Sequence, residues 1–176
     1  DVFLVGGALN AEREDLLLGY ELGRNLWSQA FLPVWERHEN GGGFVPGSVG
    51  AFLVLEARQH AEARGQKPYA RLTDVATDRS RRELGEASRV LETLLDRLDV
   101  SPGPLAVMSG ACGVEPVTSD ERAFLSGLDS RGLLAAARAY GSRLGHSVEA
   151  HFPAGVALAA LALREQRFFP PFDGSG

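Results

Sequence analysis

The feature that most constrains the fold is a series of short apolar runs separated by segments that contain glycine. Residues 2–5, 51–55 and 105–108 are such runs, of four or five apolar residues each. Runs without polar alternation are typical of strands buried on both faces, as in parallel sheets. We expect residues 2–5 to form a buried parallel strand, and the strands with intervening helical segments to build a layered α/β domain.

Helices are expected between and after these strands. Leucine and valine recur at spacings of three and four in the clearest of them, and Gly65 suits the position after a helix end. A second strand, antiparallel to 51–55, is expected at residues 69–76, and residues 131–139 fit either a strand or a helix. The helices expected before residue 100 span residues 12–27, 56–64 and 81–98.

Two further helices are expected near the C-terminus. Thr118 or Ser119 suits the capping position of the first, since either hydroxyl can accept a hydrogen bond from a free backbone N–H. Pro153 is expected to open the second, over residues 154–166. This helix is rich in alanine and leucine, so it should be buried on most sides.

Composition excludes several kinds of partner and site. The chain has 18 basic and 23 acidic residues and a net charge of −5, which argues against nucleic acid or an anionic membrane. Its one cysteine excludes a disulfide framework and fits a reducing compartment, so we expect a cytoplasmic protein. No apolar run is long enough to span a membrane. We expect no cofactor and no metal, since His146 and His151 are spaced i, i+5 and cannot share one helix face.

Several stretches of the chain resemble β-ketoacyl synthases. Residues 43–56 (Gly-Phe-Val-Pro-Gly-Ser-Val-Gly-Ala-Phe-Leu-Val-Leu-Glu), followed by His-Ala-Glu-Ala-Arg-Gly at 60–65, resemble the middle of those enzymes. Gly-His-Ser at 145–147, before an Ala/Leu-rich helix and the Pro170–Pro171 pair, resembles a segment of their second half. Residues 2–8 are similar to their strand that ends in Gly-Gly-Ala. Order and approximate spacing match across nearly the whole chain.

The resemblance implies a thiolase-like fold of α/β/α layers with a mixed sheet, made of two similar halves. Active members of the family are well over twice this long. Residues 1–50 match the end of the first half, and residues 51–176 match the second half without its last strands. The resemblance therefore implies that the chain begins at a strand of a larger fold, and that it is a fragment or has a partner that supplies the rest.

The resemblance also locates the family's chemistry. A condensing enzyme uses a cysteine thiolate to take the acyl group, two histidines to stabilise the developing charge, and a lysine that organises them. The family's cysteine would lie before Asp1. Ser109 stands at the first histidine and Gly141 at the lysine, while His146 matches the second histidine. Serine cannot carry charge or relay a proton as imidazole does, and glycine removes the cation.

The resemblance therefore implies a ketosynthase-like subunit of fatty-acid or polyketide synthesis that does not itself condense, like a chain-length factor. Its partners would be an active ketosynthase and an acyl carrier protein, in a hetero- or homodimer. Whether any transferase activity remains is open. One alternative is an acyltransferase that uses Cys112 or Ser109 with His146, and another is a purely structural association module. Cys112 also fits a small buried apolar residue, and His146 a structural histidine.

Overall fold

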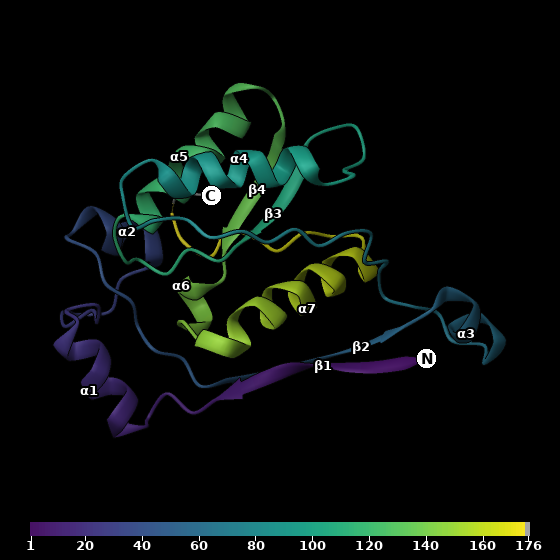
Figure 1. Cartoon of the computed structure of the whole chain (residues 1–176), viewed down its shortest axis with the longest axis horizontal. Coiled ribbons are helices and arrows are strands. Elements are labelled where there is room, and N and C mark those ends of the chain that lie inside the picture. The colour runs from purple at the N-terminus through teal and green to yellow at the C-terminus, as the bar shows by residue number, and fades with distance from the viewer. Residues whose placement is uncertain (175–176) are drawn as a thin grey trace.

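The computed structural model describes residues 1–174 of the chain, and its helices and strands stack in layers (Figure 1). Helices α4 and α5 cover one side of the β3–β4 pair. Helix α7 lies on the other side, between that pair and β1–β2. The elements in chain order are β1 (Val2–Leu9), α1 (Glu14–Leu22), α2 (Val34–Glu39), β2 (Val49–Glu56), α3 (Arg58–Ala63), α4 (Glu86–Arg97), β3 (Leu105–Ser109), α5 (Val117–Ser130), β4 (Leu134–Ala139), α6 (Gly141–Leu144), a 3₁₀ turn (Val148–Ala150) and α7 (His151–Arg164).

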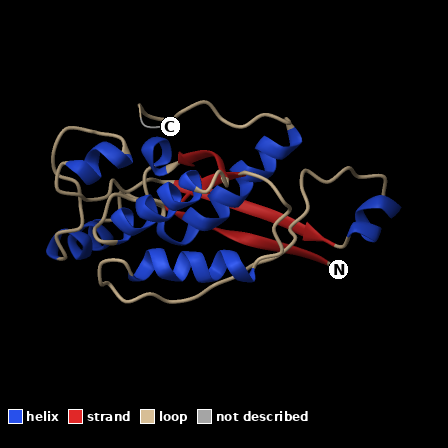
Figure 2. Cartoon of the chain, turned by 90° about the horizontal axis from the view of Figure 1, so that it is seen from above, coloured by secondary structure: helices blue, strands red, loops and turns tan. Residues whose placement is uncertain are grey.

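Strand β1 is not the buried parallel strand that its apolar run predicts. It pairs antiparallel with β2, from Val2 opposite Glu56 to Leu9 opposite Val49. Opposite residues of an antiparallel pair share a face, so Leu4 and Val54 lie together on the side away from α7, and both are exposed. Only one face of the pair is covered within the described residues, which explains the exposed apolar side chains. The ribbon extends toward the N-terminus, and α3 lies beyond its end (Figure 2).

Strands β3 and β4 form a parallel pair, as the apolar run at 105–108 predicts for β3. Residues 131–139, for which the sequence left two alternatives, end in strand β4. The described residues thus form two sheets of two strands each, the antiparallel pair β1–β2 and the parallel pair β3–β4. Parallel neighbours place their carboxyl ends at the same edge, so Ser109 and Ala139 are opposite each other there.

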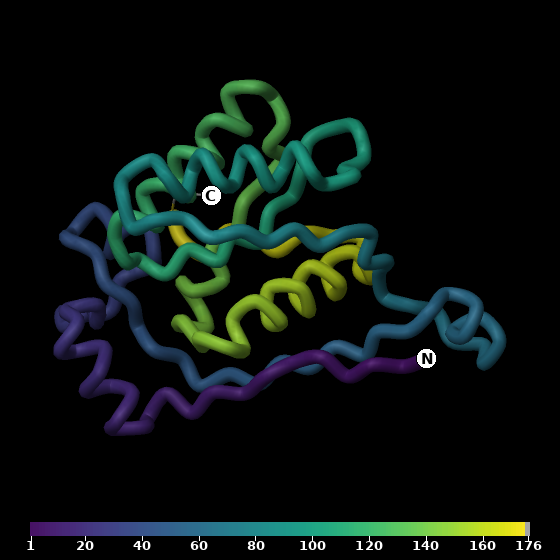
Figure 3. Tube along the Cα trace, in the orientation of Figure 1, coloured from purple at the N-terminus to yellow at the C-terminus, as the bar shows by residue number. Residues whose placement is uncertain are grey.

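The strand expected at residues 69–76 does not form. This stretch crosses from α3 back toward α4 without entering a sheet (Figure 3). Tyr69 connects it to α7, because its ring centroid lies 4.2 Å from the guanidinium carbon of Arg164. A strand needs a paired neighbour, and sequence alone cannot supply it. Gly65 does follow the end of α3 with a φ of +68°, as its position predicts.

The starts of α5 and α7 also differ from expectation. Thr118 lies inside α5, where its hydroxyl donates to the Val114 carbonyl and accepts from the Gly113 N–H, and no side chain caps the helix. Helix α7 begins at His151, which puts Pro153 in its first turn, where the N–H is not needed. Its apolar surface is not buried on most sides: Phe152 is 70% exposed, because the two-stranded sheets cover only part of the helix.

The buried core consists of small clusters that position the site. One joins Ala51 of β2, Ala154 of α7 and Tyr140, which follows β4. The other joins Val34 of α2 to Ala111 and Ala139. Both clusters therefore hold the carboxyl ends of β3 and β4 against their neighbours. No helix within residues 1–174 is long and apolar enough to cross a membrane.

Candidate functional site

Two motif segments that are far apart in the sequence lie side by side in the structure. The Gly47 N–H donates to the carbonyl of His146 at 3.0 Å, and the His146 N–H donates to the carbonyl of Val45 at 2.8 Å. These bonds join the loop before β2 to the turn between α6 and α7. A Cβ atom on Gly47 would lie 1.8 Å from the Leu144 carbonyl oxygen, so this approach requires glycine.

His146 is a neutral imidazole with a fixed tautomer. The Val148 N–H donates to its Nδ1 at 3.1 Å, so the ring proton is on Nε2. One face of the ring stacks on His151, with centroids 4.3 Å apart and planes 16° apart, and Phe44 lies 5.3 Å away in a tilted contact. Burial, and then the nearby His151, lower the pKa of His146 to about 4. The side chain can therefore donate a hydrogen bond but does not carry charge at neutral pH.

His151 anchors the same stack from the first turn of α7. Its Nε2 lies 3.1 Å from the Gly110 carbonyl, and its ring lies 4.4 Å from that of Tyr140. The Tyr140 hydroxyl donates to the backbone carbonyl of His151 at 2.9 Å. Burial lowers the pKa of His151 and raises that of Tyr140, so both side chains stay neutral.

A strained residue connects the two histidines. Val148 has a φ of +44°, which β-branched residues rarely adopt because the side chain crowds the backbone. This reversal and the 3₁₀ turn fold the chain so that residues spaced i, i+5 can stack. The expectation that this spacing separates His146 from His151 holds for one helix, but here the residues lie on a turn and on a helix end.

Ser109, which the resemblance places at the family's first histidine, is fully enclosed at the end of β3. Its hydroxyl donates to Glu121 Oε1 at 2.7 Å and accepts from the Ala111 N–H at 3.2 Å. Burial raises the pKa of Glu121, which comes from α5, and the bond from Ser109 opposes this rise. With 1% of its surface exposed and its hydrogen bonds complete, Ser109 fits a framework role.

Gly141, which the resemblance places at the family's lysine, lies in a space closed to side chains. A Cβ atom there would lie 2.8 Å from the carbonyl oxygen of Ala111 and 3.3 Å from a methyl carbon of Val34. The backbone conformation would accept another residue, since the φ of Gly141 is not positive. The limit at this position is packing against the loop after β3.

Cys112 lies in that loop, beside a buried cation. Burial raises the pKa of the Cys112 thiol, which favours the unreactive protonated form. The Arg37 guanidinium donates to the carbonyls of Cys112, Gly43 and Leu32, and burial lowers its pKa. Arg37 thus ties the glycine-rich loop to the loop after β3. Within residues 1–174, no hydrogen bond or ring contact joins Cys112 or Ser109 to His146.

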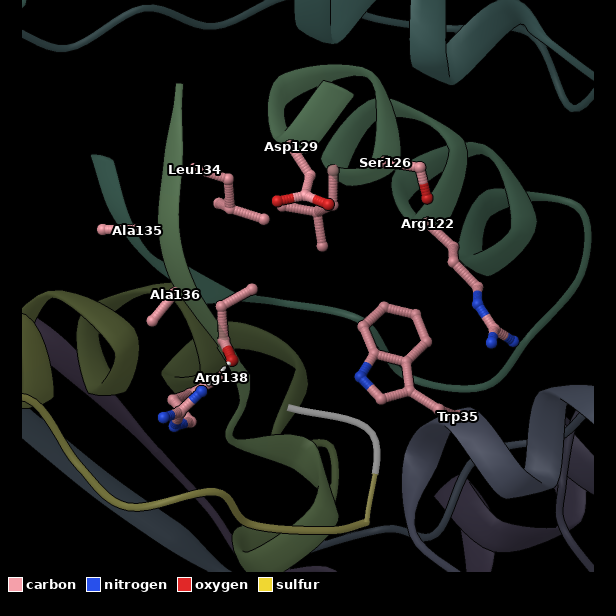
Figure 4. Close-up of a pocket in the computed structure, with 10 residues that line it drawn as sticks. Trp35, Arg122, Ser126, Asp129, Leu134, Ala135, Ala136 and Arg138 are labelled. Carbon is pink, nitrogen blue, oxygen red and sulfur yellow. Dashed lines mark hydrogen bonds between the residues drawn. The ribbon is translucent and has the colours of Figure 1, made fainter. Parts of the chain in front are cut away.

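A pocket within the described residues lies away from these side chains. It follows β4 along Leu134–Arg138 and is bounded by α5 and by Trp35, with a volume of about 490 Å³ (Figure 4). Both of its basic side chains have protein partners: Arg122 pairs with Glu39, and Arg138 donates to the Phe169 carbonyl. The pocket includes none of the residues that the motifs select, so it does not define the candidate site.

The structure adds residues that the sequence did not single out. Glu121, Arg37 and Tyr140 carry no motif, and their roles depend on burial that only the fold creates. His151 is visible in the sequence, but its position beside His146 depends on the reversal at Val148. Within the described part of the chain, no group of three or more potential metal ligands comes together.

Comparison of the sequence with protein-family models and with curated proteins finds no match. Comparison with solved structures does. A type II polyketide synthase acyl-carrier protein in complex with its ketosynthase matches with a TM-score of 0.76 and 20% identity, covering 94% of this chain and 44% of that chain. The chain has a ketosynthase fold. This confirms the fold class that the motifs imply.

Two further structures share the ketosynthase fold. The ishigamide ketosynthase/chain length factor matches with a TM-score of 0.70 and 24% identity, over 94% of this chain and 41% of that chain. An oxazolomycin ketosynthase domain from Streptomyces albus JA3453 matches with a TM-score of 0.71 and 20% identity, over 97% and 31%. The chain thus spans less than half the length of each ketosynthase structure that it matches.

Proposed function

We propose that the chain is a ketosynthase-like subunit of polyketide or fatty-acid assembly that does not itself condense and that acts with an active ketosynthase. The observation that carries this proposal is the closed space at Gly141, where a Cβ atom would meet the Ala111 carbonyl at 2.8 Å. A lysine side chain has no room there, and Ser109 stands where the resemblance places the imidazole of the first histidine. The chain therefore lacks two of the groups that a condensing site needs.

The proposal includes the domain assignment and the partners. Residues 1–50 are assigned to the end of the first ketosynthase half and residues 51–176 to the second half. The partners are an acyl carrier protein and an active ketosynthase, in agreement with the assemblies named for the similar structures. The exposed apolar face of β1–β2, with Leu4, Phe52 and Val54, is a surface of the kind that protein partners cover.

The acyltransferase alternative has no observation in its favour. Burial raises the pKa of the Cys112 thiol, and the Ser109 hydroxyl is bonded to a carboxyl whose pKa is itself raised by burial. An activated nucleophile needs a lowered pKa or an adjacent base that can take its proton. In the described part of the chain, neither residue contacts His146, the one catalytic histidine of the family that the motifs retain.

A condensation assay tests the proposal. The purified protein is incubated with malonyl-loaded acyl carrier protein and an acyl primer, alone and together with a type II ketosynthase encoded beside it. We expect no product from the protein alone, and a change in product chain length when both are present. A matched control uses Gly19→Lys, a substitution on exposed α1 that should leave the result unchanged. Condensation by the protein alone would overturn the proposal.

A further inference from the structure

Two buried polar atoms in the turn before α7 have no partner in the described residues. They are Nδ1 of His151 and Oγ of Ser147, on side chains that are 7% and 1% exposed. Because the Gly110 carbonyl can only accept, Nε2 of His151 carries the ring proton and Nδ1 is a free acceptor. Protonating Nδ1 would bury a charge without an acceptor, so this ring is held neutral by its surroundings.

The His151 ring fills space that two glycines leave open. A Cβ atom on Gly110 would lie 3.9 Å from its Cδ2, and a Cβ atom on Gly141 would lie 3.9 Å from its Cε1. A Cβ atom at either glycine would therefore be in van der Waals contact with the ring. The imidazole therefore occupies the region between the loop after β3 and the start of α6.

The backbone is strained where it brings the two rings together. Val148 holds a φ of +44°, and its N–H donates to Nδ1 of His146. Such a conformation is unfavourable for a β-branched residue, and residues of this kind cluster at functional sites. Its consequence here is the stack of His146 on His151 at 4.3 Å. The strained residue, the unpartnered polar atoms and the space between the two glycines thus all lie in or beside the stack of His146 on His151.

We propose that His151 is a positioning residue for His146, with its ring held by Gly110 and Tyr140 so that His146 presents a neutral Nε2–H to an uncharged carbonyl oxygen. The proposal rests on the proposed function, in which an acyl chain is the ligand that carries such an oxygen. His151 acts in this proposal only through its stack on His146, with ring centroids 4.3 Å apart. A neutral donor selects a carbonyl over a carboxylate, because it offers no charge to offset the desolvation of an anion.

Nuclear magnetic resonance tests the positioning role on the full chain without any acyl ligand. Two-bond ¹H–¹⁵N spectra at neutral pH report which ring nitrogen of His146 carries the proton. We expect a single Nε2–H tautomer in the natural protein and a mixture in His151→Ala, where the supporting ring is lost. His151→Phe keeps a ring of similar size and is expected to restore the single tautomer. His60→Ala, on an exposed histidine of α3, is the matched control.

The backbone amide spectrum shows whether each variant is folded. A folded His151→Ala that keeps a single Nε2–H tautomer on His146 would overturn the proposal. If His151→Ala does not fold, His151→Phe decides alone, since a mixed tautomer in that folded variant would also contradict a role for the ring. The measurement involves no ketosynthase, so its outcome is independent of the condensation assay. A failed condensation proposal would leave the positioning role intact, and the reverse also holds.

Discussion

The loop after β3 and the turn before α7 face each other across the candidate site, but their polar groups are satisfied differently. In the loop, the Ser109 hydroxyl both donates and accepts a hydrogen bond, and burial raises the pKa of the Cys112 thiol and so favours its protonated form. In the turn, Val148 is strained, and two buried atoms of Ser147 and His151 have no partner in residues 1–174. Complete hydrogen bonding is typical of a framework, whereas strain and unpartnered polar atoms mark functional sites.

This difference shows where the proposed subunit could still place a polar group against a ligand, since the side chains of the loop are already engaged. The loop has become part of the packing, and Gly141 lies against it. In the turn, the His146 imidazole has a defined tautomer and stacks on the ring of His151. The largest expected effect on stability comes from overpacking the loop at Gly141. The next comes from protonating the histidines of the turn at low pH, and the smallest from removing the Ser109 hydroxyl from the loop.

Gly141→Lys should be the most disruptive single change. Its Cβ would lie 2.8 Å from the Ala111 carbonyl and 3.3 Å from a methyl carbon of Val34, so the charged side chain would have to enter the packing between the loop after β3 and α2. Overpacking and a buried charge together should lower the free energy of unfolding by on the order of 4 kcal/mol. Urea unfolding of the two proteins measures the difference.

Gly19→Lys is the matched control for this change. Gly19 lies inside α1, and nothing lies within 4 Å of a Cβ atom added there. Lysine favours a helix over glycine, so the control should stabilise the protein by up to about 1 kcal/mol. If Gly141→Lys proved as stable as this control, the loop could move aside and the lysine position would be open after all.

Acidification should weaken the turn next. The pKa of His146 is lowered from 6.5 to about 4 in the folded protein, so the unfolded chain binds more protons between these values. Stability is then fully present above about pH 6.5 and is lost as the pH falls toward about 4, by up to about 3 kcal/mol. The lowered pKa of His151 acts in the same direction.

Urea unfolding at a series of pH values between 7 and 4 measures this loss. The variant His146→Gln keeps a polar side chain that does not titrate, so its stability should fall less steeply over the same range. An equal slope in the two proteins would show that His146 is already charged or freely solvated in the folded state. The turn would then not be the buried, neutral region that the comparison requires.

The sequence predicts most of the framework and only part of the turn. The runs at 51–55 and 105–108 form strands, and Gly65 ends a helix, because these features depend on local preferences. The strand expected at 69–76 is wrong because a strand needs a neighbour to pair with. The direction of β1 is wrong for a related reason, since an apolar run does not say which strand lies beside it.

The candidate site follows the same division. The motifs select both the loop before β2 and His146, and the structure joins them through the backbone bonds of Val45 and Gly47. The pairing of His146 with His151 could not be predicted, because no propensity places a β-branched residue such as Val148 at positive φ. The burial that raises the pKa of Glu121 likewise arises only from tertiary packing.

Ser109→Ala should have the smallest effect of the three changes, and it asks whether the loop is framework alone. The substitution removes the bond to Glu121 at 2.7 Å and leaves the Ala111 N–H without its hydroxyl acceptor. Losing one buried partner in this way costs about 1–3 kcal/mol, and we expect the lower half of that range because burial raises the pKa of Glu121 and so favours its neutral form. Thermal unfolding measures the change.

Glu121→Gln is the matched variant, because glutamine keeps the volume and an oxygen that can accept from Ser109. It should cost less than about 1 kcal/mol, since the bond survives and the carboxyl that it replaces is held toward its neutral form. Both variants should leave the effect on a partner ketosynthase unchanged. A folded Ser109→Ala that abolished this effect would place chemistry in the loop as well as in the turn, and the contrast between the two regions would fail.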